Sequence, residues 1–442
     1  MLMRDNPQPD TQGPLPALLR TYRLLAGAAQ PLVPLLLGYR LRRNKEDAAR
    51  LAERRGESII ARPPGSLVWV HGASVGEIIS ALPLIERLDA RGFAVLVTSG
   101  TVTSARVAAQ RLPPRAIHQF VPLDTPAFVT RFLDHWRPDL ALFMESDLWP
   151  NLILSASARG IPLVLVNGRM SERSFRHWQR APRTIAALLR RFDLCLAQSP
   201  ADAVRYSELG AHASSTGNLK LDAPPPPADA AALDTLKQAI AGRTVIAAAS
   251  THPAEEGIVI DVHRRLRADF PNLLTLFAPR HPERGTAIAE AARGAGLNAV
   301  LRSSGALPDG SSDLYVVDTV GELGLVYRVA PMVFIGGSLA SHGGQNPIEA
   351  AKLGVAILHG PHVWNFKDIY AALDAAHGAE QVSDADTLAT RLHCWLADCD
   401  ARIAVARAGS KTIDRLGGAL VRTLTALEPS LARLCVHGPG DA

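Results

Sequence analysis

The chain has 442 residues, of which 47% are apolar, 20% charged and 5% aromatic. This length allows two or more domains with cores of their own, and the composition excludes an intrinsically disordered protein. The four cysteines are irregularly spaced, and the 14 histidines include no HExxH motif. We therefore predict no disulfide-rich fold, no metal site and no cofactor.

The net charge of +5 is concentrated at the N-terminus. Residues 1–62 contain 11 basic and 6 acidic side chains, and the rest of the chain carries 36 of each sign. Although the isoelectric point of about 9.2 is typical of nucleic-acid-binding proteins, the neutral remainder gives no general basic surface. We therefore expect no nucleic-acid partner.

An apolar run, Leu24–Gly38, lies inside this basic segment with basic residues on both sides. It is shorter than the roughly 20 residues that a membrane-spanning helix needs, and Pro31 and Pro34 would kink such a helix. The pattern favours a monotopic anchor through residues 15–43 on the anionic, cytoplasmic leaflet of a membrane. A kinked helix packed on the protein itself is the alternative.

After Pro63-Pro64-Gly65, short apolar runs alternate with longer segments of helical periodicity. This alternation predicts a parallel sheet covered by helices on both faces. The predicted strands are Leu67–Val70, Ala94–Thr98, Ile117–Val121, Leu140–Phe143, Pro162–Val166 and Leu194–Ala197.

Four consecutive prolines within residues 223–229 predict a stiff linker, after which the alternation restarts. The sequence thus predicts an α/β protein with two Rossmann-like, doubly wound domains facing a cleft. Its parts are an N-terminal segment (1–62), a first domain (63–222), the linker and a second domain with terminal helices (230–442). Strands of the second domain are expected at Thr244–Ala249, Leu273–Ala278, Leu314–Val317, Met332–Ile335 and Val355–Leu358.

Ligands of doubly wound sheets bind at the carboxyl ends of the strands, so residues just after strands are the candidates for chemistry. Gly72–Gly76 follows the first strand and fits G-x-S-x-G, the turn that presents a nucleophilic serine, here Ser74. Alternatively, the glycines let backbone approach a ligand while Glu77 begins a helix. The helix dipole would keep Glu77 ionised, as a general base or simply as a cap.

Two further places in the first domain carry charged candidates. Glu145 and Asp147 follow the fourth strand and predict a polar cluster, although Asp147 also suits a helix cap. Lys220 lies just before the linker, where it either meets an anion or points to solvent.

In the second domain a glycine pair, Gly336-Gly337, follows a strand, and a helix start is expected shortly after it. Asn346, Pro347 and Glu349 match the N-cap, N1 and N3 positions of that helix. A glycine loop before a helix N-terminus predicts a phosphate site. Arginine can clamp a phosphate, so Arg280 after a neighbouring strand supports that prediction, as do the amides around Gly321.

At these residues the chain resembles the Kdo (3-deoxy-D-manno-oct-2-ulosonic acid) transferases of lipopolysaccharide and lipid A biosynthesis. Shared motifs extend over nearly the whole length, with Gly168 and Gln345 replacing the alanine and histidine common in that family. The matching segments are Ser74–Glu77, Glu145–Ile153, Asn167–Ser174, Gly217–Asp222, Ala249–Glu256, Ala278–Arg284, Asp318–Leu323, Gly336–Val355 and Gly360–Ile369.

The resemblance implies a GT-B glycosyltransferase that transfers Kdo from CMP-Kdo, bound by the second domain, to a lipid A precursor bound by the first. It implies a metal-independent, inverting displacement in which Glu77 is the general base and Glu145 and Lys220 are further catalytic residues. The implied CMP contacts are Pro279, Arg280, Val320, Gly321, Glu322, Asn346, Pro347, Ile348 and Glu349.

Two other functions stay open at this point. One is a serine hydrolase that uses Ser74, and the other is a non-catalytic, membrane-associated nucleotide-binding module.

Overall fold

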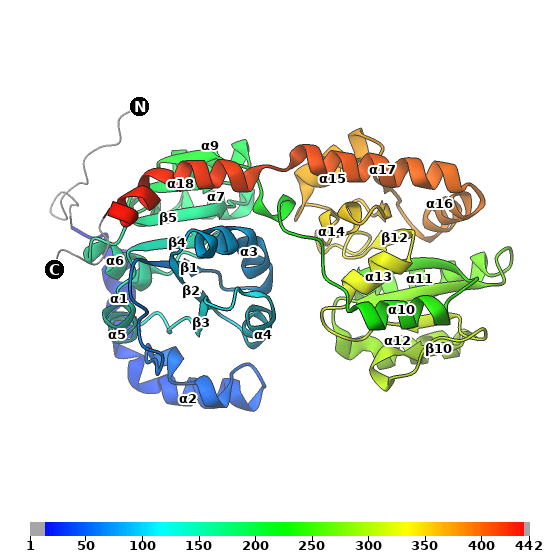
Figure 1. The fold of residues 1–442 in the computed structure, drawn as a ribbon, viewed down its shortest axis with the longest axis horizontal. Helices are drawn as coiled ribbons and strands as arrows, with labels where there is room; N and C mark the ends of the chain where they lie inside the picture. The colour runs from blue at the N-terminus through cyan, green and yellow to red at the C-terminus, as the bar shows by residue number, and fades with distance from the viewer. Residues whose placement is uncertain (1–13, 437–442) are drawn as a thin grey trace. The chain divides into compact units, whose positions relative to one another are not determined.

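The computed structural model describes residues 14–436, which form two compact units. Of the described residues, the first unit contains 14–223 together with 417–436, and the second contains Pro224–Leu416. Both are built from a parallel sheet with helices packed on it (Figure 1).

The first sheet has seven parallel strands in the order β3-β2-β1-β4-β5-β6-β7. Six of them lie where the apolar runs predicted strands, and the seventh, a short edge strand, was not predicted. The strands are β1 (Leu67–His71), β2 (Ala94–Ser99), β3 (Ile117–Phe120), β4 (Leu140–Met144), β5 (Leu163–Gly168), β6 (Leu194–Ala197) and β7 (Ala213–Ser215).

The strand order reverses between β1 and β4, which are hydrogen-bonded neighbours. The chain builds outward from β1 to β3 and then returns to build outward from β4 to β7. At such a reversal the two connections leave the carboxyl ends of the neighbouring strands in opposite directions, and this is where ligands of such sheets bind.

Helices cover both faces of the first sheet, and their starts follow capping rules. Ser74, Thr101 and Ser199 accept hydrogen bonds from backbone amides at three of these starts, and proline occupies the first turn of four helices. The helices are α3 (Val75–Ala90), α4 (Val102–Arg111), α5 (Pro126–Trp136), α6 (Pro150–Ala158), α7 (Glu172–Trp178), α8 (Pro182–Leu189) and α9 (Pro200–Glu208).

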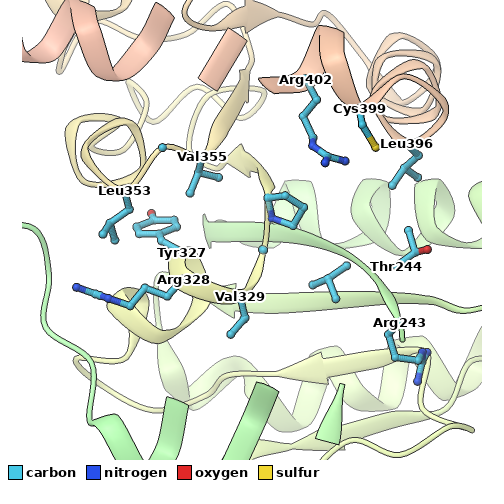
Figure 2. A pocket seen from close by; sticks show the side chains of 14 residues that line it. Arg243, Thr244, Tyr327, Arg328, Val329, Leu353, Val355, Leu396, Cys399 and Arg402 are labelled. Atoms are coloured by element: carbon cyan, nitrogen blue, oxygen red, sulfur yellow. The ribbon is translucent and has the colours of Figure 1, made fainter. Parts of the chain in front are cut away.

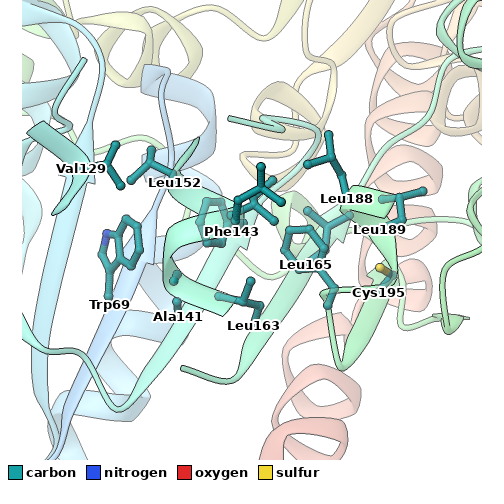
Figure 3. Packing of buried hydrophobic residues seen from close by; sticks show 14 of the residues in the cluster. Trp69, Val129, Ala141, Phe143, Leu152, Leu163, Leu165, Leu188, Leu189 and Cys195 are labelled. Atoms are coloured by element: carbon teal, nitrogen blue, oxygen red, sulfur yellow. The ribbon is translucent and has the colours of Figure 1, made fainter. Parts of the chain in front are cut away.

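The core of this unit is apolar on both sides of the sheet. Trp69, Phe143 and Leu165 point from neighbouring strands toward helix residues such as Val129 and Leu188 (Figure 3). These side chains are almost fully buried. Such packing explains why the strands read as continuous apolar runs.

The N-terminal segment forms α1 (Ala17–Ala28), η2 (Gln30–Leu32) and α2 (Val33–Arg42), followed by the short turns η3 (Ala48–Arg50) and η4 (Glu53–Arg55). Among the described residues, no single helix is long and apolar enough to span a membrane. The helical pair Ala17–Ala28 and Gln30–Arg42 passes that test only jointly and is bent by 43°.

The segment packs on the first unit through part of its surface. Leu19, Val33 and Leu37 are buried, and the Tyr22 hydroxyl donates to Asp124 Oδ2 at 2.9 Å. The described part of residues 1–62 is therefore continuous with the first unit.

The second sheet also has seven parallel strands, in the order β10-β11-β9-β8-β12-β13-β14. Its order reverses between β8 and β12, which pair directly. The strands are β8 (Thr244–Thr251), β9 (Leu273–Pro279), β10 (Ala299–Leu301), β11 (Leu314–Val316), β12 (Met332–Ile335), β13 (Ala356–His359) and β14 (Glu380–Gln381).

Helices and short turns connect these strands, and two long helices follow them. The helices and short turns of the second unit are α10 (Ala230–Ala239), α11 (Pro253–Leu266), η6 (Pro282–Arg284), α12 (Gly285–Gly294), η7 (Arg302–Ser304), α13 (Leu323–Val329), α14 (Ile348–Lys352), α15 (Lys367–Ala375), α16 (Ala385–Ala397) and α17 (Cys399–Leu416).

The C-terminal helix α18 (Ala419–Val436) differs from the sequence-based expectation, which placed it in the second domain. It belongs to the first unit (Figure 1). Leu427 and Leu431 of this helix join a core cluster with residues of β1 and α3. The carboxylate of Asp222 also accepts from the amides of Gly418 and Leu420, at 2.7 and 2.6 Å. The apolar face of α18 thus packs against the first unit, and the second unit ends at residue 416.

Candidate functional site

Glu77 lies where the strand order of the first sheet reverses, directly after β1. It is the third residue of α3, and its side chain turns back over the helix start. Oε1 accepts from the Ser74 hydroxyl at 2.9 Å, and Oε2 accepts from the Ala73 amide at 2.7 Å. Gly72 is needed here because a Cβ at that position would lie 3.1 Å from Glu77 Cβ.

The Glu77 carboxyl has an environment that favours its neutral form. Its pKa is raised to about 7, mainly by burial and then by the negative charges of Asp147 and Glu145, against hydrogen bonds from Ser74 and Ala73 that lower it. The expectation that the helix dipole keeps Glu77 fully ionised is therefore wrong, because desolvation outweighs the dipole. At neutral pH the group is close to half-protonated.

The predicted polar cluster after β4 forms beside Glu77. Burial raises the pKa of Asp147, and its charge together with that of Glu145 acts on Glu77. Glu145 has a left-handed backbone conformation, with φ of 56°, which is uncommon for a residue other than glycine. Such strained residues occur frequently at functional sites.

Lys220 meets a carboxylate of its own chain. Its Nζ lies 2.5 Å from Glu145 Oε1, and both side chains are largely buried. The backbone around Lys220 is fixed by two asparagines, since Asn218 Oδ1 accepts from its amide and Asn167 Oδ1 accepts from the Leu219 amide. The solvent-facing alternative for Lys220 is therefore wrong.

Asn167 is a site residue that the sequence did not single out. It is fully buried, has a left-handed φ of 56° at the end of β5, and holds the short turn η5 (Leu219–Leu221) that carries Lys220. An asparagine next to a glycine at a strand end was the available signal.

Ser74 does not have the surroundings of a nucleophilic serine. It is the N-cap of α3 with an extended backbone (φ −109°, ψ 166°), whereas a nucleophile turn is strained. Its hydroxyl donates to Glu77, and among the described residues no histidine is hydrogen-bonded to it. The geometry therefore favours a capping role for Ser74 over the elbow.

The glycine loop after β12 binds a carboxylate of the protein itself. Glu255, the third residue of α11, is fully buried and accepts from the amides of Gly337, Ser338, Leu339, Ala340 and His252 at 2.7–3.1 Å. The backbone amides of the loop after Gly336, which were predicted to bind a phosphate, are thus already hydrogen-bonded to the Glu255 carboxylate. Glu255 was missed because nothing near it in sequence shows where its partners lie.

The helix after this loop starts one residue later than predicted and is short. Helix α14 begins at Ile348, so Pro347 is its N-cap. Asn346 nevertheless caps this start, because its Oδ1 accepts from the Ile348 amide at 3.0 Å and its Nδ2 donates to Glu349 Oε1 at 3.1 Å.

The other predicted CMP contacts share this edge of the second sheet. Pro279 is the last residue of β9, and Arg280, which follows it, is exposed. Val320, 72% exposed, and Gly321, with φ of 89°, follow the neighbouring strand β11.

The side chain of Glu322 forms an ion pair within the protein. Its carboxylate accepts from Arg302 Nη2 at 2.6 Å and from Arg302 Nε at 2.9 Å, and this guanidinium lowers the pKa of Glu322. The carboxylate of Glu322 is thus already paired with a cation of the same unit.

Three histidines at this edge were not predicted. The rings of His252 and His342 stack at 4.1 Å, and His281 lies edge-on to His252 at 6.0 Å. Burial and the neighbouring His342 lower the pKa of His252, and Gln345 Nε2 lies 3.2 Å from its Nε2. Together with Arg280 they form a set of side chains that can carry positive charge toward an anionic ligand.

A cavity of about 530 Å³ in the second unit lies at the opposite edge of the sheet (Figure 2). Thr244 and Val355, which come just before or at strand starts, line it together with Arg243 and Arg402. It therefore does not coincide with the candidate donor residues. Among residues 14–436, no group of three or more potential ligands is arranged to hold a metal ion.

Sequence comparison connects this geometry to known proteins. A family model described as 3-deoxy-D-manno-octulosonic-acid transferase (kdotransferase) matches residues 49–223. The chain is 33% identical over 420 residues to the 3-deoxy-D-manno-octulosonic acid transferase of Haemophilus influenzae, covering 93% of this chain and 98% of that one. The corresponding protein of Bordetella pertussis is 36% identical over 421 residues, covering 92% and 98%.

Solved structures agree on the fold. A glycosyltransferase from Rickettsia africae superposes with a TM-score of 0.58 at 10% identity, covering 83% of this chain and 99% of that one. The Anabaena protein HepE, solved with UDP and glucose, gives 0.56 at 12% identity, covering 83% and 100%. Both support a GT-B-type fold with two Rossmann-like domains. With the motifs, the two sheets and relatives matched over nearly their full length, the chain belongs to the 3-deoxy-D-manno-octulosonic acid transferases, a family of glycosyltransferases.

Proposed function

We propose that this protein transfers Kdo from CMP-Kdo to a hydroxyl of a lipid A precursor with inversion, and that Glu77 is the general base. The observation that carries the proposal is the Glu77 carboxyl, which is buried beside two other acids with a pKa of about 7. A general base works best when its pKa lies near the working pH.

In the proposed step the acceptor hydroxyl attacks the anomeric carbon of Kdo. The new carbon–oxygen bond forms as the bond from that carbon to the phosphate oxygen breaks, and CMP leaves with the electron pair. The hydroxyl proton passes to Glu77. The Ser74 hydroxyl and the Ala73 amide fix the orientation of the carboxylate that receives it.

The ion pair between Glu145 and Lys220 sets the charge around this base. Lys220 balances Glu145 at 2.5 Å, which limits how far the cluster raises the pKa of Glu77. We propose that Glu145 and Lys220 also contact the transferred sugar or the acceptor, as the matching residues of the family are expected to do.

The donor nucleotide is proposed to bind at the carboxyl edge of the second sheet. Pro279 and Arg280, the backbone of residues 320–322 and the turn at residues 346–349 share that edge. Because Glu255 occupies the loop amides, the charge of the leaving CMP must be met by side chains. The guanidinium of Arg280 supplies such charge, so we propose a reaction that needs no metal or cofactor.

We further propose that residues 15–43 hold the enzyme on the cytoplasmic face of the bacterial inner membrane. Leu24, Leu25 and Leu35 are 74%, 64% and 73% exposed, which is unusual for leucines gathered on one segment. Basic side chains flank them. An apolar surface with a basic border suits an anionic lipid surface.

Incubation with CMP-Kdo and a tetra-acylated lipid A precursor tests the activity. The wild-type chain should release CMP and lengthen the acceptor by Kdo. The Ser74→Ala variant should lose only part of this activity, because the Ala73 amide still holds the carboxylate, and Glu77→Ala should lose it. The transferase proposal fails if Ser74→Ala is inactive while Glu77→Ala is active, or if folded wild-type protein releases no CMP.

A further inference from the structure

A second cavity lies in the first unit, away from Glu77. It has a volume of about 840 Å³ and is bounded by the start of α1 and by α7, α8 and the end of α9. Its apolar walls include Leu15, Phe175, Ala187 and Leu209. None of its lining residues belongs to the candidate catalytic or donor residues.

Three arginines also line this cavity, namely Arg183, Arg190 and Arg191. Among the described residues, none of them forms an ion pair with a carboxylate, although Glu208 lines the same cavity. Arg23 of α1 is close enough to act on Arg191, whose pKa is lowered by burial and then by that like charge. Positive charge gathered without acidic partners is typical of an anion site.

Leu15 and Pro16, which line the cavity, lead directly into α1, the helix that carries exposed leucines. Arg23 is followed directly by Leu24 and Leu25, whose side chains point to solvent. A ligand for such a place has a negative charge for the arginines and an apolar body for the adjoining surface. A free phosphate satisfies only the first requirement.

We propose that this cavity binds the phosphodiester headgroup of an anionic membrane phospholipid, with the acyl chains directed toward the exposed leucines of α1. The inference rests on the proposed membrane association, and it adds a discrete lipid site outside the N-terminal basic segment. The guanidinium groups of Arg183 and Arg190 bind the phosphate, and the apolar walls exclude water from it.

The test uses the full-length chain and lipids that stay monomeric in water. Binding of dihexanoyl phosphatidylglycerol, dihexanoyl phosphatidylcholine and inorganic phosphate is measured by titration calorimetry. The site variant is Arg183→Gln with Arg190→Gln. The matched control is Arg87→Gln with Arg106→Gln, which removes two exposed charges from α3 and α4 of the same unit.

We expect phosphatidylglycerol to bind at least about tenfold more tightly than either other probe, since only it offers both a net charge and an apolar body. The site variant should weaken that binding by about tenfold or more, and the control by less than about twofold. Equal affinity for inorganic phosphate, equal loss in both variants, or no binding to the folded wild-type chain would each overturn the lipid site.

Two further readouts separate this inference from the proposals on which it builds. Kdo transfer in detergent should be unchanged in the site variant, because its residues lie outside the catalytic cluster. If the wild-type chain binds the soluble lipid but not vesicles, the membrane anchor is wrong while the headgroup site stands.

Discussion

Glu77 and Glu255 occupy equivalent places in two similar units but have opposite surroundings. Each is the third residue of the helix that follows a central strand, at the point where its sheet reverses order. Glu255 accepts five backbone hydrogen bonds and is fully buried. Glu77 accepts only two hydrogen bonds, one from the Ser74 hydroxyl and one from the Ala73 backbone amide, and the carboxylates of Asp147 and Glu145 lie nearby.

The difference shows what makes a carboxylate available for chemistry. The five amide donors hold the Glu255 carboxylate in one position, so this side chain shapes the loop after β12. Burial with too few donors leaves Glu77 between its two protonation states. The same helix position therefore serves structure in one unit and, in our proposal, proton transfer in the other.

The largest expected effect comes from replacing Glu77 by glutamine. Glutamine keeps the size of the side chain but cannot accept the proton, so kcat should fall by about 10³-fold. CMP affinity should not change, because the proposed CMP contacts lie in the second unit. Steady-state kinetics and CMP binding by calorimetry check this. Retention of more than about a tenth of the activity would contradict the assignment of the base.

The matched change, Glu255→Gln, should act on stability. Its amide nitrogen would face donors such as the Gly337 and His252 amides, leaving buried N–H groups without an acceptor. We expect the second unit to lose roughly 3 kcal/mol of unfolding free energy. Urea denaturation followed by fluorescence measures this. If Glu255→Gln unfolds like the wild type, the loop does not depend on the carboxylate.

Unlike Glu255→Gln, the Glu77→Gln substitution should increase the stability of the protein, and only at high pH. The pKa of Glu77 is about 7 in the folded protein and near 4.5 in the unfolded chain. The folded state therefore loses stability relative to the unfolded state as the pH rises from about 4.5 to about 7. Glutamine removes this loss. The thermal midpoint of the variant should exceed that of the wild type at pH 8 and match it at pH 5; equal midpoints at both would show that the carboxyl is not perturbed.

Removing Lys220 should alter the pH dependence as well as the rate. In Lys220→Ala the Glu145 charge is no longer balanced, so the pKa of Glu77 should rise by about one unit. The acid limb of kcat/KM should move up by the same amount, in addition to any loss of contact with the reacting groups. If the midpoint of the acid limb stays unchanged while activity falls, Lys220 contacts the substrate but does not affect the pKa of Glu77.

The smallest effect is expected at the membrane surface. Replacing Leu24 and Leu25 by serine removes two exposed apolar side chains, and vesicle binding should weaken by about tenfold or more. Sedimentation with vesicles of phosphatidylglycerol measures it, and the exposed pair Val204→Ser with Val421→Ser is the control. Equal loss in both pairs would argue against a localised anchor.

Much of the fold could be predicted because buried parallel strands read as unbroken apolar runs. Three edge strands of two or three residues were missed because they are too short to form a recognisable apolar run, namely β7 (Ala-Ser-Ser), β10 (Ala-Val-Leu) and β14 (Glu-Gln). The placement of α18 was wrong because an amphipathic helix does not indicate which sheet it will cover.

The candidate site was predictable to the extent that its residues follow strands. Glu77 and Glu145 were named on that basis and Lys220 from its position just before the linker, and the structure brings them together. The role of Glu255 was not predictable, because its loop partners lie 82 to 85 residues away in sequence. The raised pKa of Glu77 was missed for a related reason, as burial and neighbouring charges come from other elements.

The pH dependence of kcat/KM tests the central claim most directly. With CMP-Kdo and acceptor below saturation, we predict a rate that falls tenfold per pH unit below a midpoint near 7, as one proton blocks the base. The residual activity of Glu77→Gln should lack this limb. A wild-type midpoint near 4.5, the value of an unperturbed glutamate, or the same limb in Glu77→Gln would contradict the claim that Glu77 is the base.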